Sequence, residues 1–360
     1  MMKRLSILVL VLGSGVAVAD DPFDPMAEEA RPAWRPFADL LLRGDRVTGL
    51  PGGRADLERA RSRLRLGLTR SFDGGSEFGV ALRAAAGSDS NRDNRMNLDN
   101  QRSNGVWLDQ LWLRHRFSAG LELELGKAPL PLRHSPLWWD ADLRPAGVGM
   151  LQRHALGDFD ELVVALGAWR NQHLYNDRSR LLAAQLTWKG LQSSPVGIEL
   201  TAGWLRFLDI DRLAQQGLAR GNRVAQGRYL SSYRLLHVQA AALWRVADMP
   251  AELRVDWVRN LGATQRAEDS AARASLVLGD RRAPRQWEAG FAWQRFQRDA
   301  VLAAFTDDDW WFHTAARGVM PWVGYGFDST WSIRLAGFRE RRDDLDRSTR
   351  RWLLDLAAQW

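Results

Sequence analysis

Four arginines occupy every second position of one short segment, and guanidinium groups at this spacing could line a surface that contacts anions. They are Arg59, Arg61, Arg63 and Arg65, in the sequence RARSRLRLGL. A β-strand places alternate side chains on one face, whereas a helix would scatter them around its cylinder. Guanidinium stays charged and pairs with carboxylates and phosphates. The segment therefore predicts a strand with one cationic face and one small or apolar face.

Groups that could catalyse a reaction are sparse. His134 precedes Ser135, but adjacent residues do not establish a base and nucleophile pair, and a surface histidine is the simpler interpretation. The acidic run TDDDWW (306–311) could bind calcium through its carboxylates, or could be a solvated acidic loop. The chain has no cysteine and no phosphate-binding glycine motif. The six histidines are scattered without metal-ligand spacing: His115, His134, His154, His173, His237 and His313. We expect no enzymatic activity, no cofactor and no metal.

The composition of the 360-residue chain favours a membrane over nucleic acid. The net charge is +7, with 50 lysines and arginines, of which only three are lysine. A basic chain could bind nucleic acid, but 18 tryptophans against four tyrosines are more typical of a protein at a membrane–water boundary. No nucleic-acid partner is expected.

The N-terminus has the pattern of a secretory signal. Residues 1–19 join a short basic region to an apolar stretch that ends in Ala17-Val18-Ala19. We expect a signal peptide over 1–19, a periplasmic segment over 20–36 and a single domain over 37–360. Beyond the signal, no run of about 18 apolar residues predicts a membrane helix.

Alternation of apolar and polar residues recurs from residue 37 onward. Leu121, Leu123 and Leu125, for example, alternate with Glu122 and Glu124. Segments of roughly ten such residues have the length of a tilted membrane strand. About sixteen are expected, near 37–47, 59–70, 77–86, 106–117, 120–126, 147–155, 161–170, 181–189, 196–206, 233–246, 251–260, 271–279, 286–296, 318–327, 331–339 and 350–360.

The connections alternate between short turns and longer polar segments, which is the layout of an outer-membrane barrel. The longest segments are 87–105, 127–146, 207–232 and 297–317. Charged residues on the alternate faces would be intolerable in a packed core but suit a water-filled lumen. Ten tryptophans near strand ends suggest interfacial girdles: Trp107, Trp112, Trp169, Trp188, Trp204, Trp244, Trp287, Trp331, Trp352 and Trp360. The expected fold is an all-β, transmembrane, antiparallel up-and-down β-barrel of about 16 strands, with short periplasmic turns and longer outer loops.

Several segments resemble the "putative porin" family of Gram-negative outer membranes. They are RARSRLRLGL, GVALRAAAGSDSN, VWLDQLWLRHRF and LELELGKAPLPLRHSPLWWDADLRPAGVGM, within residues 37–155. The resemblance implies a passively diffusing barrel in the outer membrane, with outer-membrane lipid and small hydrophilic or anionic solutes as its partners. A weaker similarity to alginate-export-type barrels leaves an export channel for an acidic polysaccharide as the alternative. A barrel enzyme or adhesin would need a catalytic dyad or large outer loops, and neither is evident.

Two groups of residues are candidates for the permeation path. The first, expected to line the pore, combines the arginine segment with charged residues of the following strands: Arg59, Arg61, Arg63, Arg65, Arg83, Asp109, Glu122 and Glu124. Such a wall would favour anions. The second lies in the proline-rich segment 127–146, which is either a constriction loop folded into the barrel or an ordinary external loop: Lys127, Arg133, Asp140, Asp142 and Arg144.

The C-terminal sequence RRWLLDLAAQW resembles the signal that outer-membrane barrels present to the barrel-assembly machinery, although a chance amphipathic strand is the alternative. Leu353 interrupts its alternation. The residues that would share the signal's apolar face are Trp352, Leu354, Leu356, Ala358 and Trp360. Both a monomer and a homotrimer are compatible with the sequence.

Overall fold

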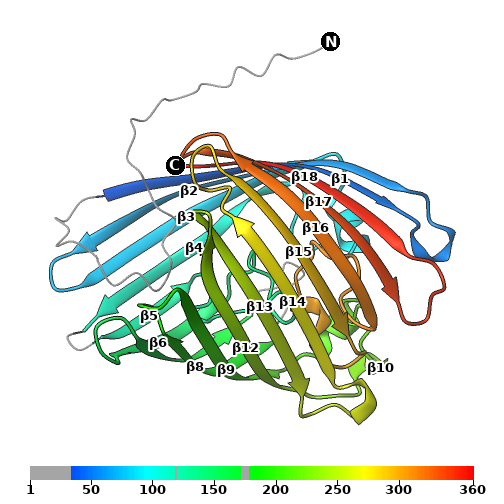
Figure 1. The fold of residues 1–360 in the computed structure, drawn as a ribbon. Helices are drawn as coiled ribbons and strands as arrows, with labels where there is room; N and C mark the ends of the chain where they lie inside the picture. Colours follow the sequence, from blue (N-terminus) through cyan, green and yellow to red (C-terminus); the bar gives the residue numbers. More distant parts are fainter. Residues whose placement is uncertain (1–33, 118–119, 172–177) are drawn as a thin grey trace.

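Sixteen antiparallel strands form a closed barrel in the computed structural model, which describes residues 34–117, 120–171 and 178–360 (Figure 1). The expected signal peptide (1–19) and all but the last three residues of the expected periplasmic segment (20–36) lie outside the described residues. The barrel strands are β1 (Trp34–Thr48), β2 (Leu57–Phe72), β3 (Ser76–Gly87), β4 (Gly105–Arg116), β5 (Leu121–Lys127), β6 (Ala146–Ala155), β7 (Glu161–Arg170), β8 (Arg180–Gly190), β9 (Val196–Leu208), β12 (Tyr233–Val246), β13 (Met249–Asn260), β14 (Ser270–Gly279), β15 (Trp287–Phe296), β16 (Ala316–Gly326), β17 (Trp331–Arg342) and β18 (Thr349–Gln359). Each lies within a few residues of an expected strand.

Every barrel strand pairs with its neighbour along the chain, and β1 closes the ring against β18. The closing register runs from Asp39 opposite Gln359 to Thr48 opposite Arg350. Trp360 then exchanges two backbone hydrogen bonds with Ala38, at 3.1 and 2.9 Å. Among the described residues, each barrel strand is therefore paired on both sides.

The connections differ sharply between the two ends of the barrel. At the end that holds the C-terminus they are short turns, such as the two residues between β12 and β13. At the opposite end lie four long connections, which we name loop 2 (88–104), loop 3 (128–145), loop 5 (209–232) and loop 7 (297–315). Loops 2, 5 and 7 contain the short elements α1 (Asn91–Met96), α2 (Asp211–Gln215), the hairpin of β10 (Val224–Ala225) and β11 (Arg228–Tyr229), and η3 (Ala303–Phe305); η1 (Pro51–Gly53) and η2 (Arg266–Glu268) lie in two shorter connections. Among the described residues, no helix has the length and apolar character needed to span a bilayer.

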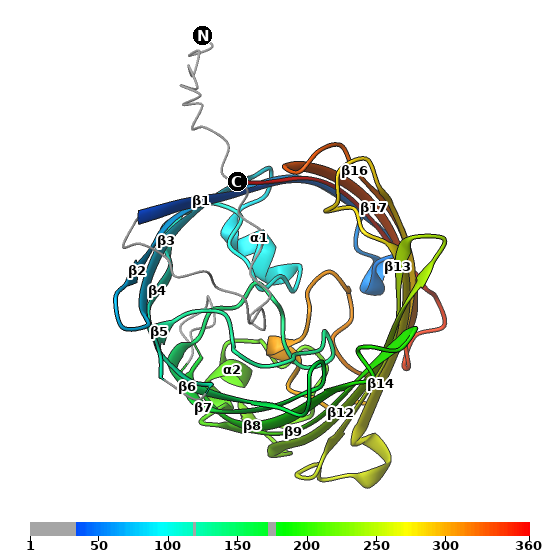
Figure 2. The ribbon, with the colours of Figure 1, turned by 60° about the vertical axis from the view of Figure 1, so that its left-hand side comes forward.

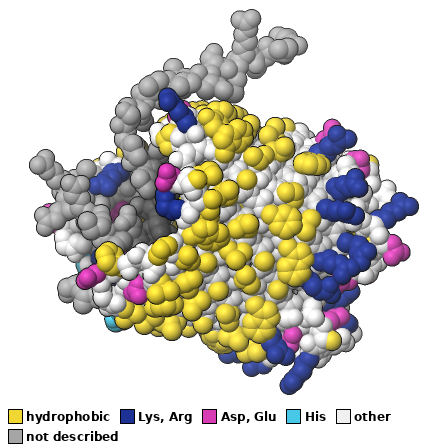
Figure 3. Space-filling model, in the orientation of Figure 1, with side chains coloured by type: hydrophobic (Ala, Val, Ile, Leu, Met, Phe, Trp, Pro, Cys, Tyr) yellow, Lys and Arg dark blue, Asp and Glu magenta, His cyan; other side chains and the backbone are white. Residues whose placement is uncertain are grey.

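Alternate side chains of each strand point away from the lumen. Between the two ends of the barrel, most of these outward side chains are apolar. On β2 and β3, for example, Leu66 and Leu82 face each other and are about half exposed. Hydrophobic side chains form a broad band over the wall (Figure 3). This band is where lipid would contact the barrel.

The interior is not uniformly polar, because the long loops fold into the ring (Figure 2). Loops 3, 5 and 7 share one hydrophobic cluster with inward residues of β6 to β9 and β12 to β15. A second cluster joins Trp310 of loop 7 to Phe338 and Leu353 on the wall. Leu353, which interrupts the C-terminal alternation, is fully buried there, as Leu235 is in the first cluster. The expected water-filled lumen is therefore partly occupied by folded loops.

Three tryptophans expected in the interfacial girdles lie inside the barrel instead. Trp107 is paired with the inward Arg83, whose guanidinium lies 5.7 Å from the centre of its ring. The register of β3 with β4 shifts between Ala81 and Leu82, and this irregularity changes which residues of β4 point inward. Trp112 consequently faces the lumen, where its ring lies against Gly79. Trp169 points inward from β7 over Gly167 and belongs to the large cluster. Small residues beneath the rings of Trp112 and Trp169 make room for them.

Candidate permeation path

The arginine segment lies on β2 and faces the interior, as the alternation predicts. Arg59 and Arg65 are buried, whereas the outward residues Leu66 and Leu68 are exposed. The segment runs from the loop end of the barrel at Arg59 towards the turn end at Arg65. The four side chains therefore form a continuous ladder along the inner wall.

Carboxylates hold the ladder at its loop end. Arg59 pairs with Asp45 of β1 at 2.5 Å and with Asp99 of loop 2, and its side chain is only 1% exposed. Arg351 of β18 reaches the same Asp45 at 2.9 Å, and Arg61 approaches it at 3.4 Å. A buried charge is tolerated only when it is paired and hydrogen-bonded. This end of the ladder therefore anchors loop 2 to the wall.

Nearer the turn end, the ladder contacts loop 3. Arg63 makes two hydrogen bonds to Asp142, at 2.6 and 2.7 Å. Arg65 pairs with Asp39 at 2.5 Å and with Asp109 at 2.6 Å. Burial alone would raise the pKa of Asp142, but Arg63 and the neighbouring arginines outweigh burial and lower it. The positive charge of Arg63 on the ladder and the negative charge of Asp142 on loop 3 are thus in direct contact.

The remaining expected pore-lining residues fall into two places. Arg83 lies beside the ladder, where it donates a hydrogen bond to Gln101 of loop 2 and lies 3.9 Å from Asp109. Glu122 and Glu124 form a separate group at the turn end of β5, where Glu124 pairs with Arg114 and Glu122 with Arg116, each at 2.8 Å. The structure therefore brings Arg83 and Asp109 to the ladder and leaves the two glutamates apart from it.

Loop 3 lies inside the barrel against the wall of β6 to β9. Pro131 lies close above Gly149, and Leu137, Trp138 and Trp139 are buried in the large cluster. The backbone N–H of Arg133 donates to Gln185 of β8 at 2.6 Å. These contacts fix one side of the loop, and the Asp142 contact with the ladder fixes the other.

The other candidates in and beside loop 3 have individual partners. Arg133 pairs with Glu199 at 3.3 Å, and Lys127, the last residue of β5, donates to the carbonyl of Leu108 at 2.8 Å. Arg144 is buried 3.9 Å from Asp109, and its burial lowers its pKa to about 10. Asp140 accepts from Asn100 of loop 2 at 2.9 Å, and burial together with neighbouring aspartates raises its pKa. The partly exposed charges of loop 3 are those of Arg133 and Asp142, which have opposite signs.

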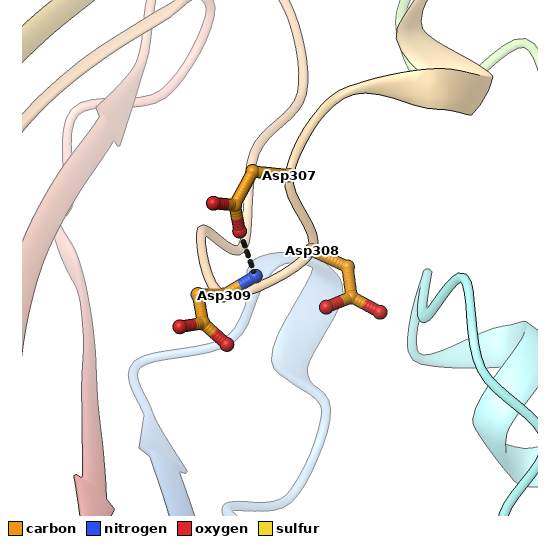
Figure 4. A group of neighbouring side chains, drawn as sticks. All are labelled: Asp307, Asp308 and Asp309. Atoms are coloured by element: carbon orange, nitrogen blue, oxygen red, sulfur yellow. Dashed lines mark hydrogen bonds between the residues drawn. The ribbon is translucent and has the colours of Figure 1, made fainter. Parts of the chain in front are cut away.

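Loop 7 presents the acidic turn for which the sequence left open calcium binding or a solvated loop (Figure 4). Carboxylate oxygens of Asp307, Asp308 and Asp309 lie within 4.8 Å of one another. Asp309 pairs with Arg43 at 2.5 Å, and Asp308 accepts the N–H of Asn100 at 2.7 Å. Burial and the charge of Asp309 raise the pKa of Asp307 to about 7. These partners account for Asp308 and Asp309 without a metal ion.

Hydrogen bonds join the inward loops to one another. Asn100 of loop 2 donates to the carbonyl of Thr306 in loop 7 at 2.8 Å. Asn222 of loop 5 donates to Val301 and accepts from Ala303, both at 2.9 Å. The backbone N–H of Asp140 donates to the carbonyl of Phe305 at 2.7 Å. Loops 2, 3, 5 and 7 therefore form one interlocked body within the ring.

His134 and Ser135 each bond to the backbone of their own loop. The Nδ1 atom of His134 lies 3.1 Å from the carbonyl of Leu132, and Ser135 accepts the N–H of Leu137 at 3.3 Å. Burial lowers the pKa of His134 to about 4, so that the ring is neutral at physiological pH. A neutral ring donates to Leu132 through Nδ1. The hydrogen bonds of His134 and Ser135 thus stabilise the backbone of loop 3.

Sequence reasoning overlooked the inward packing of loops 2, 5 and 7 and the wall residues Arg351 and Asp45. One available signal was the apolar run Val301–Phe305, which is out of place in an external polar loop and is buried here. Another was the pair of inward apolar residues, Leu235 and Leu353, that break their strands' alternation.

The comparisons with known proteins agree with this architecture. Residues 45–179 match the sequence profile of the "Putative porin" family. No curated protein sequence matches the chain significantly. OprB from Pseudomonas putida superposes with a TM-score of 0.58 at 13% identity, over 91% of this chain and 93% of that one.

Other solved outer-membrane proteins share the fold. OmpF from Salmonella typhi has a TM-score of 0.56 at 8% identity and covers 91% of this chain and 98% of its own. OmpT from Vibrio cholerae, without its loop L8, has a TM-score of 0.53 at 9% identity, with 91% and 99% coverage. Residues 45–179 are thus similar to the "Putative porin" family, and the chain as a whole has the closed barrel fold of these outer-membrane proteins.

Proposed function

We propose that this protein is an outer-membrane porin that passes small hydrophilic solutes by passive diffusion, without a chemical step, along the side of the lumen that holds the ladder. The contact of Arg63 with Asp142 carries the proposal, because it places partly exposed opposite charges on wall and loop 3. Closely spaced opposite charges create a local field that acts on polar solutes.

The proposed ion preference is for anions, but it is modest. Guanidinium groups along β2 favour anions, whereas Asp39, Asp109 and Asp142 neutralise much of their charge. This pairing also leaves no long row of free arginines for a polyanion. It therefore favours diffusion of small solutes over export of an acidic polysaccharide.

Conductance in planar bilayers tests both parts of the proposal. The purified protein should give open-channel currents, and a salt gradient should give a small reversal potential of the sign for chloride preference. Correctly folded barrels without current would refute the diffusion channel. A clear cation preference would refute only the proposed selectivity.

A further inference from the structure

Outside the lumen, arginines gather at the loop ends of β15 to β18. The outer arginine patch consists of Arg295, Arg317, Arg339, Arg341 and Arg350. The strand register places all five on the outward face, since their neighbours Ala316, Phe338 and Arg351 are buried inside. Figure 3 shows lysine and arginine side chains gathered at this end of the apolar band.

The register sets these like charges directly opposite one another. Arg317 faces Arg295 on one side and Arg341 on the other. Arg339 faces Arg350 on the next strand. Directly opposed residues of antiparallel strands have Cβ atoms about 5 Å apart, and like charges at that distance destabilise the sheet. Anions bound at the outer surface would reduce this repulsion between the arginines.

The protein itself supplies little negative charge at the patch. Arg295 lies 3.9 Å from Asp343, and both side chains are about 40% exposed. Within the described residues, the other four patch arginines have no ion pair. A partner from outside the chain would therefore relieve the repulsion.

The patch lies at the boundary between apolar wall and loops. Trp293 and Val319 face each other just towards the turn end. The ring of Trp352 lies over Gly337, close to where a Cβ atom would stand. In a barrel with its short turns in the periplasm, this boundary lies at the headgroups of the outer leaflet.

We propose that the outer arginine patch binds the phosphate groups of phosphorylated lipids in the outer leaflet. Guanidinium donates bidentate hydrogen bonds to phosphate, and the adjoining Trp293, Val319 and Trp352 would contact the acyl chains. A second copy of the chain is a poorer occupant, because two such patches would repel. At the turn end the outward residues Trp287, Tyr325 and Trp331 are aromatic instead. The two ends thus differ in the lipid chemistry that they fit.

Lipid binding by a matched pair of variants tests the proposal. The patch variant is Arg317→Gln/Arg339→Gln/Arg350→Gln, and the control removes three exposed arginines at the turn end, Arg35→Gln/Arg245→Gln/Arg282→Gln. Each protein is folded in detergent and titrated with bisphosphorylated lipid A, with the same lipid after dephosphorylation, or with inorganic phosphate. Native mass spectrometry counts bound lipid, and the unfolding temperature reports stabilisation.

The wild type and the control should bind bisphosphorylated lipid A and gain thermal stability, and the patch variant should bind it about 100-fold more weakly. Equal binding by the folded patch variant, or equal binding of the dephosphorylated lipid, would overturn the proposal. Full stabilisation by inorganic phosphate alone would show a site for free anions and would overturn the assignment to lipid.

Discussion

Single side chains on the inner wall differ in whether their charge can reach a solute. Arg59 is enclosed by Asp45 and Asp99, so that its charge serves the attachment of loop 2. Removing one member of such a buried pair typically destabilises a protein by about 3–5 kcal/mol. The pair of Arg63 and Asp142 is more exposed, with side-chain exposures of 17% and 23%. Selectivity should therefore depend on Arg63 more than on Arg59.

Replacement of Asp142 by asparagine should expose the charge of Arg63 to solutes. The chloride-to-potassium permeability ratio should rise by up to about fivefold, the factor for about 1 kcal/mol from a unit charge at 4 Å in water. Arg63→Gln should shift the ratio in the opposite direction. Reversal potentials in a salt gradient measure both changes. Identical potentials for the two variants would show that this pair lies away from the path.

Asp307 should give the channel a pH dependence near neutrality. Its pKa is raised to about 7, so the folded state holds this proton more tightly than the unfolded chain does. Between the ordinary aspartate pKa and about 7, rising pH therefore reduces the stability of loop 7, and the full reduction is present above 7. Above pH 7 the turn also gains a negative charge, facing Asp308, Asp309 and Arg273.

Current selectivity should accordingly move towards cations between pH 6 and pH 8, and Asp307→Asn should remove this step. Recordings at several pH values with both proteins provide the measurement. A step of unchanged size in the variant would assign the titration to another group.

At the scale of elements, interruptions of strand alternation mark where loops contact the wall. Leu353 points inward from β18 and packs in the cluster that contains Trp310 of loop 7. Leu235 points inward from β12 and packs in the large cluster, which contains residues of loops 3, 5 and 7. Inward apolar residues would be unfavourable in a wet lumen, so their presence indicates a folded segment above them.

Leu353→Ala should loosen loop 7 without opening the barrel. Loss of a buried leucine side chain leaves a cavity and typically removes about 2–5 kcal/mol. We expect faster protease cleavage within loop 7 and noisier single-channel currents. Leu354→Ala is the matched control, because Leu354 is the adjacent residue on the lipid-facing side and is 49% exposed. Equal cleavage of both variants would contradict a role for Leu353 in holding the loop.

For the whole molecule, the sequence predicted the barrel and its strands because alternation is a local signal. A residue and its second neighbour report which face is buried, and the ladder from Arg59 to Arg65 followed this rule. The exceptions were local as well: an irregularity in the pairing of β3 with β4 turned Trp112 inward. Contacts between the wall and the loops could not be predicted, since Arg43 and its loop 7 partner Asp309 are 266 residues apart in sequence. The interlocking of four loops depends on many such distant contacts.

The C-terminal strand is expected to direct the whole barrel to the assembly machinery. Trp360 is exposed at the turn end and makes an edge contact with Trp331, with ring centroids 5.8 Å apart. Trp360→Ala should lower the amount of barrel inserted in cells, while refolding of the purified protein in detergent stays normal. Trp287→Ala, at the same end, is the control. Equal insertion of both variants would show that Trp360 is not part of the assembly signal.

Closure of the ring by the first and last strands has a consequence for folding kinetics. The seam between β1 and β18 joins the two ends of the described chain, so that it has nearly the largest sequence separation the chain permits. Pairing over such distances is slow. Until it occurs, two strands keep unpaired backbone groups, which invite association with other chains. An unfinished barrel is therefore vulnerable to aggregation during the whole delay, and this protein needs protection until its last residues are in place.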